Sequence, residues 1–374
     1  MEYAVEVQMS KRSGTSGSAV ALVMAIVLFA PAFVAAQSGT TTKPAKKTAT
    51  ITATVTRAWT MPRTPDGQPD LQGYWSSLSF TPMQRPVKYG NREFLTDEEL
   101  SQMFKEGVQH EYEYTFDHAS DQPYYDPTVY ALGAWQNGVK PNKRTSLIVD
   151  PPDGRFPPLT PEAKKARAMK SSASADLDPN ADPEAAEANR KADSPADLGL
   201  GVRCLTFGGP PPILPRKYNS NTQIVQGAGY VLIEAEWGSE PRIIPLDGRP
   251  HLSRNIHGWH GDSRGHWEGD TLVVETTNFR PDAVPQNANA KTLKITEYFT
   301  RSYADTIEYK FTVDDPSTWT KPWTAIIPLS RSDGPMFEYA CSEGNNALIN
   351  ILAGAREADR GKATGASGTP ISQK

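Results

Sequence analysis

The most constraining feature of the sequence is a series of short segments, rich in β-branched and aromatic residues, that follows residue 220. Each segment is bounded by Gly, Pro, Asp or Asn. In chain order they are TQIVQ, YVLIEAEW, PRIIPLD, DTLVVETTNF, LKITEYFTRSY, DTIEYKFTV and WTAIIPLSR. Two similar segments, LQGYWSS and RTSLIVD, occur earlier in the chain. Such segments are typical of successive antiparallel strands.

The turns between these segments indicate how the strands connect. HWEGDTLVV predicts a hairpin that turns at Glu268, Gly269 and Asp270, and RSYADTIEY predicts another near Ala304 and Asp305. Eight or more strands that follow one another in this way predict an up-and-down barrel, which removes exposed sheet edges, or else a two-sheet sandwich. The predicted fold class is therefore mainly β and antiparallel.

A short motif favours the barrel. Gly73, Tyr74 and Trp75 resemble the glycine-x-tryptophan of the first lipocalin strand, which implies a lipocalin-like barrel. The alternative is that Trp75 is an ordinary core residue.

A few short helices are predicted to flank the strands. In LTDEELSQMFKEGVQ, Thr96 and Glu99 form a capping box. In LTPEAKKARAMK, Thr160 is an N-cap that precedes a proline at the first helical position. NALINILAGARE predicts a third helix over Asn346 to Glu357.

The N-terminal segment has the pattern of a secretory signal peptide. Lys11 and Arg12 precede the apolar run AVALVMAIVLFA, and small residues follow up to Ala36, after which we predict cleavage. A membrane anchor is the alternative, but Pro31 interrupts the run, and a spanning helix needs about 20 apolar residues. Met9 is an alternative start. We therefore expect a periplasmic or secreted protein without a stable membrane anchor.

Composition divides the remaining chain. Residues 37–58 are rich in Thr, Ala, Lys and Ser and predict a flexible linker. Residues 59–358 are predicted to form a single β-rich domain, interrupted at 171–197 by a polar, disordered insertion with Leu177 as its one large apolar residue. Residues 359–374 are predicted to be a disordered tail. The formal net charge of −4 argues against a nucleic-acid partner, for which a basic surface is expected.

The chain contains two cysteines, Cys204 and Cys341. Because disulfides persist in oxidising compartments, export predicts that they pair with each other. Two separately buried thiols are the alternative. Two cysteines without closely spaced partners do not make a zinc-finger pattern.

Several longer motifs resemble a family of secreted bacterial proteins of unassigned function. They are PDGQPDLQGYWSS, RTSLIVDPPDGR, PRIIPLDGRPHL, GDSRGHWEGDTLVVETTNF, VDDPSTWTKPWTAIIP and FEYACSEGN, and they extend from about Pro65 to Leu352. The resemblance implies export and a common fold, but no activity. His257, His260 and Ser342 depart from the pattern of that family.

The stretch NIHGWHGDSRGHWEGD gathers three of the six histidines of the chain. His257, His260 and His266 are candidate ligands for zinc or another divalent ion. No helix fixes them on one face, and two of them depart from the family pattern. We therefore predict no metal site and keep this histidine set as an alternative. The sequence does not identify a cofactor.

The same stretch contains a candidate acid–base group. Along a strand, Arg264, His266 and Glu268 point to one face, and with Asp262 they form a candidate catalytic group at the mouth of a barrel. Histidine can relay protons near neutral pH, and arginine can hold a carboxylate or an oxyanion. The alternative is that these charges face solvent and form cross-strand pairs.

Two functions remain open. The first is an exported β-barrel that binds a small, mainly apolar molecule, with four candidate ligand-binding residues: Arg249, His251, Trp267 and Trp75. The second is an extracytoplasmic lyase, isomerase or hydrolase that uses His266 as its base. Neither a nucleophile elbow nor a phosphate-binding glycine loop is present in the sequence.

Overall fold

The computed structural model describes residues 59–106, 142–169, 192–207, 209, 211–216, 219–238, 241–285 and 288–363. The predicted signal peptide and the linker that follows it lie outside the described residues, as does most of the insertion predicted at 171–197. Within the described ranges, no helix is both long and apolar enough to cross a membrane.

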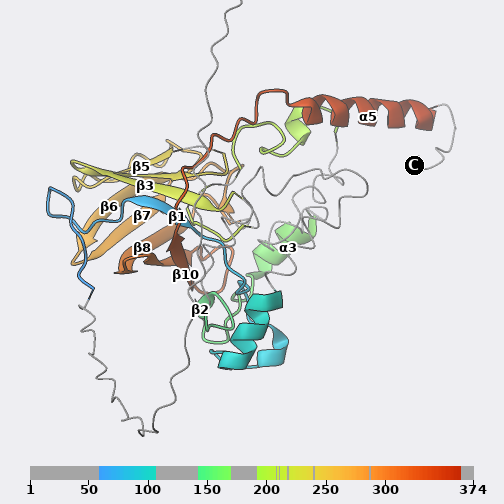
Figure 1. Cartoon of the computed structure of the whole chain (residues 1–374). Coiled ribbons are helices and arrows are strands. Elements are labelled where there is room, and N and C mark those ends of the chain that lie inside the picture. Colours follow the sequence, from blue (N-terminus) through green and yellow to red (C-terminus); the bar gives the residue numbers. More distant parts are fainter. Residues whose placement is uncertain are drawn as a thin grey trace, which may run out of the picture. The chain divides into compact units, whose positions relative to one another are not determined.

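The strands form one antiparallel sheet, as the sequence predicted (Figure 1). It contains ten strands. Their bounds are β1 (Gly73–Ser76), β2 (Ile148–Asp150), β3 (Asn221–Gly227), β4 (Tyr230–Ala235), β5 (Pro241–Pro245), β6 (Asp262–Glu268), β7 (Thr271–Thr277), β8 (Lys294–Tyr303), β9 (Thr306–Asp314) and β10 (Trp323–Arg331). The two predicted hairpins are confirmed, because β6 and β7 flank Gly269 and Asp270, and β8 and β9 flank Ala304 and Asp305.

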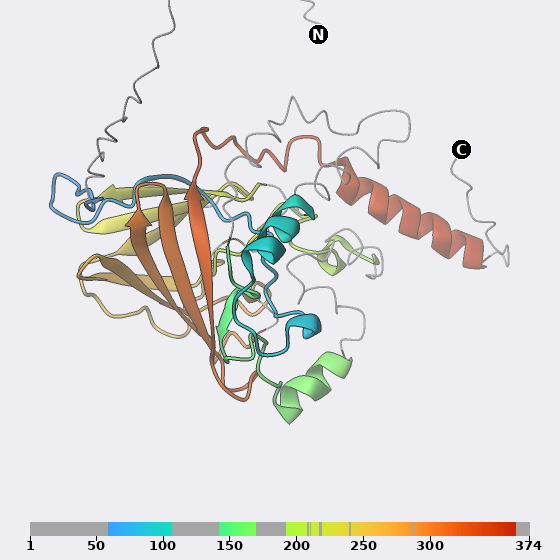
Figure 2. The same cartoon turned by 60° about the horizontal axis from the view of Figure 1, so that its bottom comes forward.

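The order of the strands makes the sheet a nearly closed barrel, which Figure 2 shows curving around its interior. The order is β5-β4-β3-β1-β10-β9-β8-β7-β6, and β2 pairs only with β10. The first strand, β1, is hydrogen-bonded on one side to β3 and on the other to β10, the last strand. Of the two predicted architectures, the barrel is therefore correct.

The barrel has a seam between β5 and β6, the two ends of this order. Nine strands that alternate in direction leave these two strands running the same way, so the chain must travel back along the barrel between them. Residues 246–261, which we call the crossover segment, make this return. At the seam, a Cβ on Gly265 would lie 2.8 Å from both Ile244 Cγ2 and Leu246 Cδ2. Glycine thus allows β6 to approach the end of β5.

The interior of the barrel is filled by large side chains. Alternate residues of β8, β9 and β10 are buried, as expected for strands with one face toward a core. Aromatic rings follow one another across these strands, with centroid distances of 4.8 Å for Phe299–Tyr309, 5.4 Å for Tyr309–Phe311 and 5.6 Å for Phe311–Trp323. This packing makes the barrel interior the main core of the protein.

The described helices begin where the sequence predicted. Residues 97–106 are helical, and the capping box is formed, because Glu99 N donates to Thr96 Oγ1 and Thr96 N donates to Glu99 Oε2. Helix α3 (Pro161–Met169) follows its N-cap, Thr160. Helix α5 (Asn346–Ala363) continues through the predicted domain end at residue 358. Two short 3₁₀ turns complete the set: η1 (Val87–Tyr89) and η3 (Pro195–Asp197).

Cys204 and Cys341 form a disulfide, as predicted. Their Cα atoms are 5.6 Å apart across a sequence separation of 137 residues. The bond joins the loop that precedes β3 to the segment between β10 and α5. In the chain-entropy description, closing so long a loop in the unfolded chain stabilises the fold by an upper figure of about 4.7 kcal/mol.

Candidate functional site

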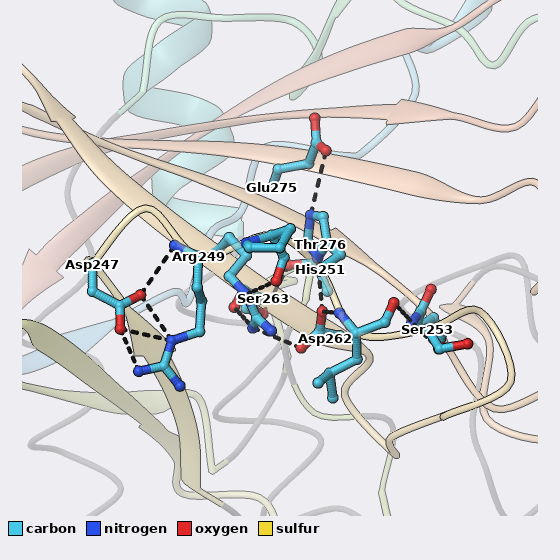
Figure 3. A network of polar contacts seen from close by, with 12 residues as sticks. Asp247, Arg249, His251, Ser253, Asp262, Ser263, Glu275 and Thr276 are labelled. Carbon is cyan, nitrogen blue, oxygen red and sulfur yellow. Dashed lines mark hydrogen bonds and ion pairs between the residues drawn. The ribbon is translucent and has the colours of Figure 1, made fainter.

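The first polar group of interest is centred on Asp262, the first residue of β6 (Figure 3). Its carboxylate is nearly buried. One oxygen, Oδ2, lies 2.8 Å from His251 Nδ1 and accepts a 2.9 Å hydrogen bond from Leu252 N. The other, Oδ1, accepts a 2.6 Å hydrogen bond from Arg264 Nη1. We call Asp262, His251 and Arg264 the seam cluster.

His251 stands between two carboxylates, as Figure 3 shows. Its Nε2 lies 3.4 Å from Oε1 of Glu275, a residue of β7 that also pairs with Lys294. The His251 side chain is 25% exposed. The ring is therefore held between Asp262 and Glu275, and part of it is reachable from solvent.

The seam cluster also attaches the crossover segment to the barrel. Arg264 Nε donates to Pro250 O at 3.0 Å, and Asn278 Nδ2 donates to the carbonyls of Leu252 and Ser253 at 3.0 and 3.1 Å. Backbone and side-chain groups over 250–253 are thus held by residues at the start of β6 and just after β7. These bonds fix the backbone on both sides of His251 against the barrel.

The other candidate catalytic residues lie apart from this cluster. Arg264, His266 and Glu268 alternate along β6 as predicted, but they are on the outer face of the barrel, while Gly265 faces the core. His266 Nε2 lies 3.0 Å from Glu268 Oε1, and the two side chains are 61% and 63% exposed. The structure therefore brings Asp262 and Arg264 to His251, and leaves His266 with Glu268 in solvent.

The candidate ligand-binding residues separate in a similar way. Arg249 pairs with exposed Asp247, to one side of the seam cluster in Figure 3. This hydrogen-bonded pairing lowers the pKa of Asp247 and raises that of Arg249. Trp75 is fully buried in the core, and its indole N–H donates to Leu71 O. Trp267 packs against the core, and its indole nitrogen is buried without a partner in the described structure.

The alternative metal ligands are not gathered by the fold. His257 is exposed, and His260 lies beside Gly209, where a Cβ would be 3.1 Å from the imidazole Cε1. Throughout the described ranges, no three His, Cys, Asp or Glu side chains come together in a way that could hold a metal ion.

A second polar group, which the sequence analysis missed, lies inside the barrel. Glu297 of β8 is 0% exposed and receives two hydrogen bonds from the buried guanidinium of Arg242 on β5, at 2.5 and 3.1 Å. The hydroxyl of Tyr309 on β9 donates to Glu297 Oε1 at 2.8 Å. We call these three residues the interior trio. Because Glu297 has the same strand parity as Ile295 and Phe299, alternation along β8 could have placed it inside.

Burial affects the Tyr309 hydroxyl of the interior trio and one nitrogen of its guanidinium. Burial, followed by the nearby negative charge of Glu297, raises the pKa of the Tyr309 phenol well above its usual value of 10.0. Arg242 Nε is buried and has no hydrogen-bond partner among the described residues. Tyr309 therefore remains a neutral donor, and the guanidinium retains one N–H that no described residue accepts.

No protein-family model matches the chain, and neither does any curated protein or any solved structure. Function must therefore follow from the chemistry of the seam cluster and the interior trio.

Proposed function

We propose that this protein is an exported β-barrel that binds a small, mainly apolar molecule in the barrel interior. The observation that carries the proposal is the interior trio. Ligand-binding interiors are mostly apolar and contain a few converging polar groups that orient the ligand. Arg242, Glu297 and Tyr309 are such a group within a core that is otherwise dominated by aliphatic and aromatic side chains.

Energetics support a role for the trio beyond stability. Taking two charges out of water costs several kcal/mol per ion, and a well-packed apolar replacement of a buried ion pair is often neutral or stabilising. Arg242 Nε, which has no hydrogen-bond partner in the described part of the chain, adds a further cost. Apolar side chains in these positions would stabilise the core at least as well. Buried polar groups, in contrast, can orient a ligand.

Export is part of the proposal. It is supported by the signal-peptide pattern that ends near Ala36 and by the disulfide between Cys204 and Cys341. We also propose, from the GDSRGHWEGDTLVVETTNF motif, that the protein belongs to the secreted bacterial family that shares it.

The proposal is tested by producing the full chain in a bacterial host, recovering the mature protein from the periplasm, and comparing its native and denatured masses. We expect an N-terminus at Gln37 and a native mass that exceeds the denatured mass by that of a small organic molecule. Native protein that carries no added mass and binds no apolar probe would contradict the binding function. Retention in the cytoplasm with an uncut N-terminus would contradict export.

The seam cluster favours a second candidate, an extracytoplasmic enzyme. Asp262 holds His251 Nδ1, and a carboxylate in this position orients an imidazole whose other nitrogen acts as a general base. In His251 that nitrogen, Nε2, faces the half-exposed Glu275 at 3.4 Å, so a substrate would take the place of Glu275 there. Arg264 adds a positive charge beside the same carboxylate. The enzyme hypothesis therefore centres on His251 rather than on His266.

A screen of elimination, isomerisation and hydrolysis substrates tests the second candidate. Any turnover that is found should fall by about 10² or more in His251→Ala. The matched control is His266→Ala, which should retain it. Equal activity of the two variants would exclude His251 as the base.

A further inference from the structure

One loop of the protein enters the barrel interior and contacts the interior trio. Residues 211–216 precede β3, and Ile213 among them is only 5% exposed and belongs to the main core. The backbone N–H of Ile213 donates to the hydroxyl oxygen of Tyr309 at 3.0 Å. This peptide group is thus a fourth polar partner of the interior trio, and it comes from the backbone.

The attachment of this loop differs from that of the strands around it. Three of its residues, Pro211, Pro212 and Pro215, have no backbone N–H and cannot join a strand ladder. Among the described residues, 211–215 make no backbone–backbone hydrogen bond. The loop is held by the buried side chains of Ile213 and of its three prolines, and by the bond to Tyr309. Two further hydrogen bonds, each 3.1 Å long, run from Ser77 Oγ to Leu214 O and from Arg216 Nη2 to Phe207 O.

The polarity of the trio specifies what could replace Ile213. The Tyr309 hydroxyl gives its proton to Glu297, so its oxygen can only accept from a further group. A hydroxyl or an amide N–H can donate to Tyr309, whereas a carboxylate has no proton to give Tyr309 and would face the charge of Glu297.

We infer that the ligand is an apolar molecule with a hydroxyl or amide donor at one end, and that it binds by displacing Ile213 from the interior trio. The donor takes the place of the Ile213 N–H on Tyr309, and the apolar body takes the place of the Ile213 side chain. This inference rests on the proposed binding function and adds to it a class of ligand and a site.

The test measures the binding of a matched pair of probes, 1-decanol and decyl methyl ether, by tryptophan fluorescence and calorimetry. The two probes share an apolar chain, but only the alcohol has a donor. For the full exported chain we expect the alcohol to bind about tenfold more tightly than the ether, the value of one buried hydrogen bond. In Tyr309→Phe this preference should disappear. Tyr298→Phe is the matched control, because it removes the same hydroxyl from the outer face of β8 and should retain the preference.

The second variant, Ile213→Ala, tests displacement. A purely structural Ile213 would make this variant bind either probe no better than the wild type. Displacement predicts that both probes bind at least about threefold more tightly, because a smaller side chain competes for the same space. Circular dichroism melting curves show whether each variant is folded at the assay temperature.

These measurements distinguish failure of the donor site or of displacement from failure of the binding function. Binding of both probes with equal affinity by the wild type, or a preference that survives in Tyr309→Phe, would overturn the donor site and leave the binding function standing. Unchanged or weaker binding by folded Ile213→Ala would overturn displacement. Failure of both probes to bind the folded wild type and folded Ile213→Ala would overturn the proposed binding function itself.

Discussion

The interior trio and the seam cluster contain the same kinds of groups and differ in their exposure to water. Each places an arginine on a carboxylate, with a third residue that can hydrogen-bond to it. In the trio the carboxylate is fully buried, whereas the seam cluster is reached by solvent through His251. Water can replace a lost partner at the seam but not in the core. The same contact therefore has a larger energetic consequence inside the barrel.

The largest expected effect comes from breaking the trio. Arg242→Met leaves the Glu297 carboxylate buried without its charge partner, and we expect it to lower the free energy of unfolding by about 3–5 kcal/mol. Denaturant titration measures this loss. The double variant Arg242→Met/Glu297→Leu should recover most of it, since no charge is then left buried. Arg249→Met is the control, because it removes an exposed arginine from Asp247 and should leave the unfolding midpoint unchanged.

The next effect comes from breaking the seam cluster. Asp262→Ala removes the acceptor of His251, Leu252 and Arg264, and we expect a loss of about 1–3 kcal/mol, smaller than that of Arg242→Met. The loss should be local. Trypsin should cut the crossover segment after Arg254 roughly tenfold faster than in the wild type. A loss as large as that of Arg242→Met would remove the distinction between the two groups.

Alkaline pH should destabilise the interior trio through Tyr309. The pKa of Tyr309 is raised in the folded state, so above about pH 10 the unfolded chain releases a proton that the native protein keeps. The stabilisation is complete below pH 10 and is lost as the pH rises toward the folded pKa. We expect the fall in unfolding free energy above pH 10 to be shallower in Tyr309→Phe than in the wild type. An unaltered slope would mean that Tyr309 is not buried as described.

The smallest expected effect is that of His266→Ala. The side chain is exposed and pairs only with the equally exposed Glu268 among the described contacts, so stability should change by less than about 0.5 kcal/mol. Thermal unfolding measures this change. A loss above 1 kcal/mol would show that the outer face of β6 is covered in solution.

Much of the fold could be predicted because its signals are local. Alternation and turn residues identified the strands from β3 to β10, and the capping residues Thr96 and Thr160 located two helix starts. The same alternation grouped Arg264, His266 and Glu268 on one face of β6. The alternation did not specify whether this face is the inner or the outer face of the barrel, because that depends on how the sheet closes. In the structure Gly265, on the opposite face of β6, packs against the end of β5.

The candidate site was only partly predictable. His251, Asp262 and Arg264 were all noticed, but their convergence depends on the return path of the crossover segment, which no local pattern specifies. Glu297 could have been assigned to the interior from its neighbours along β8. The partner of Glu297 could not be predicted from local alternation, because Arg242 lies on β5, at the far end of the strand order.

Native mass spectrometry of two exported proteins side by side shows whether the interior trio holds a ligand. They are the wild type and the double variant Arg242→Met/Glu297→Leu, whose barrel should remain folded. We predict that a small organic mass is retained by the wild type and lost from the double variant. Equal retention by both proteins, or an empty wild type, would contradict this prediction.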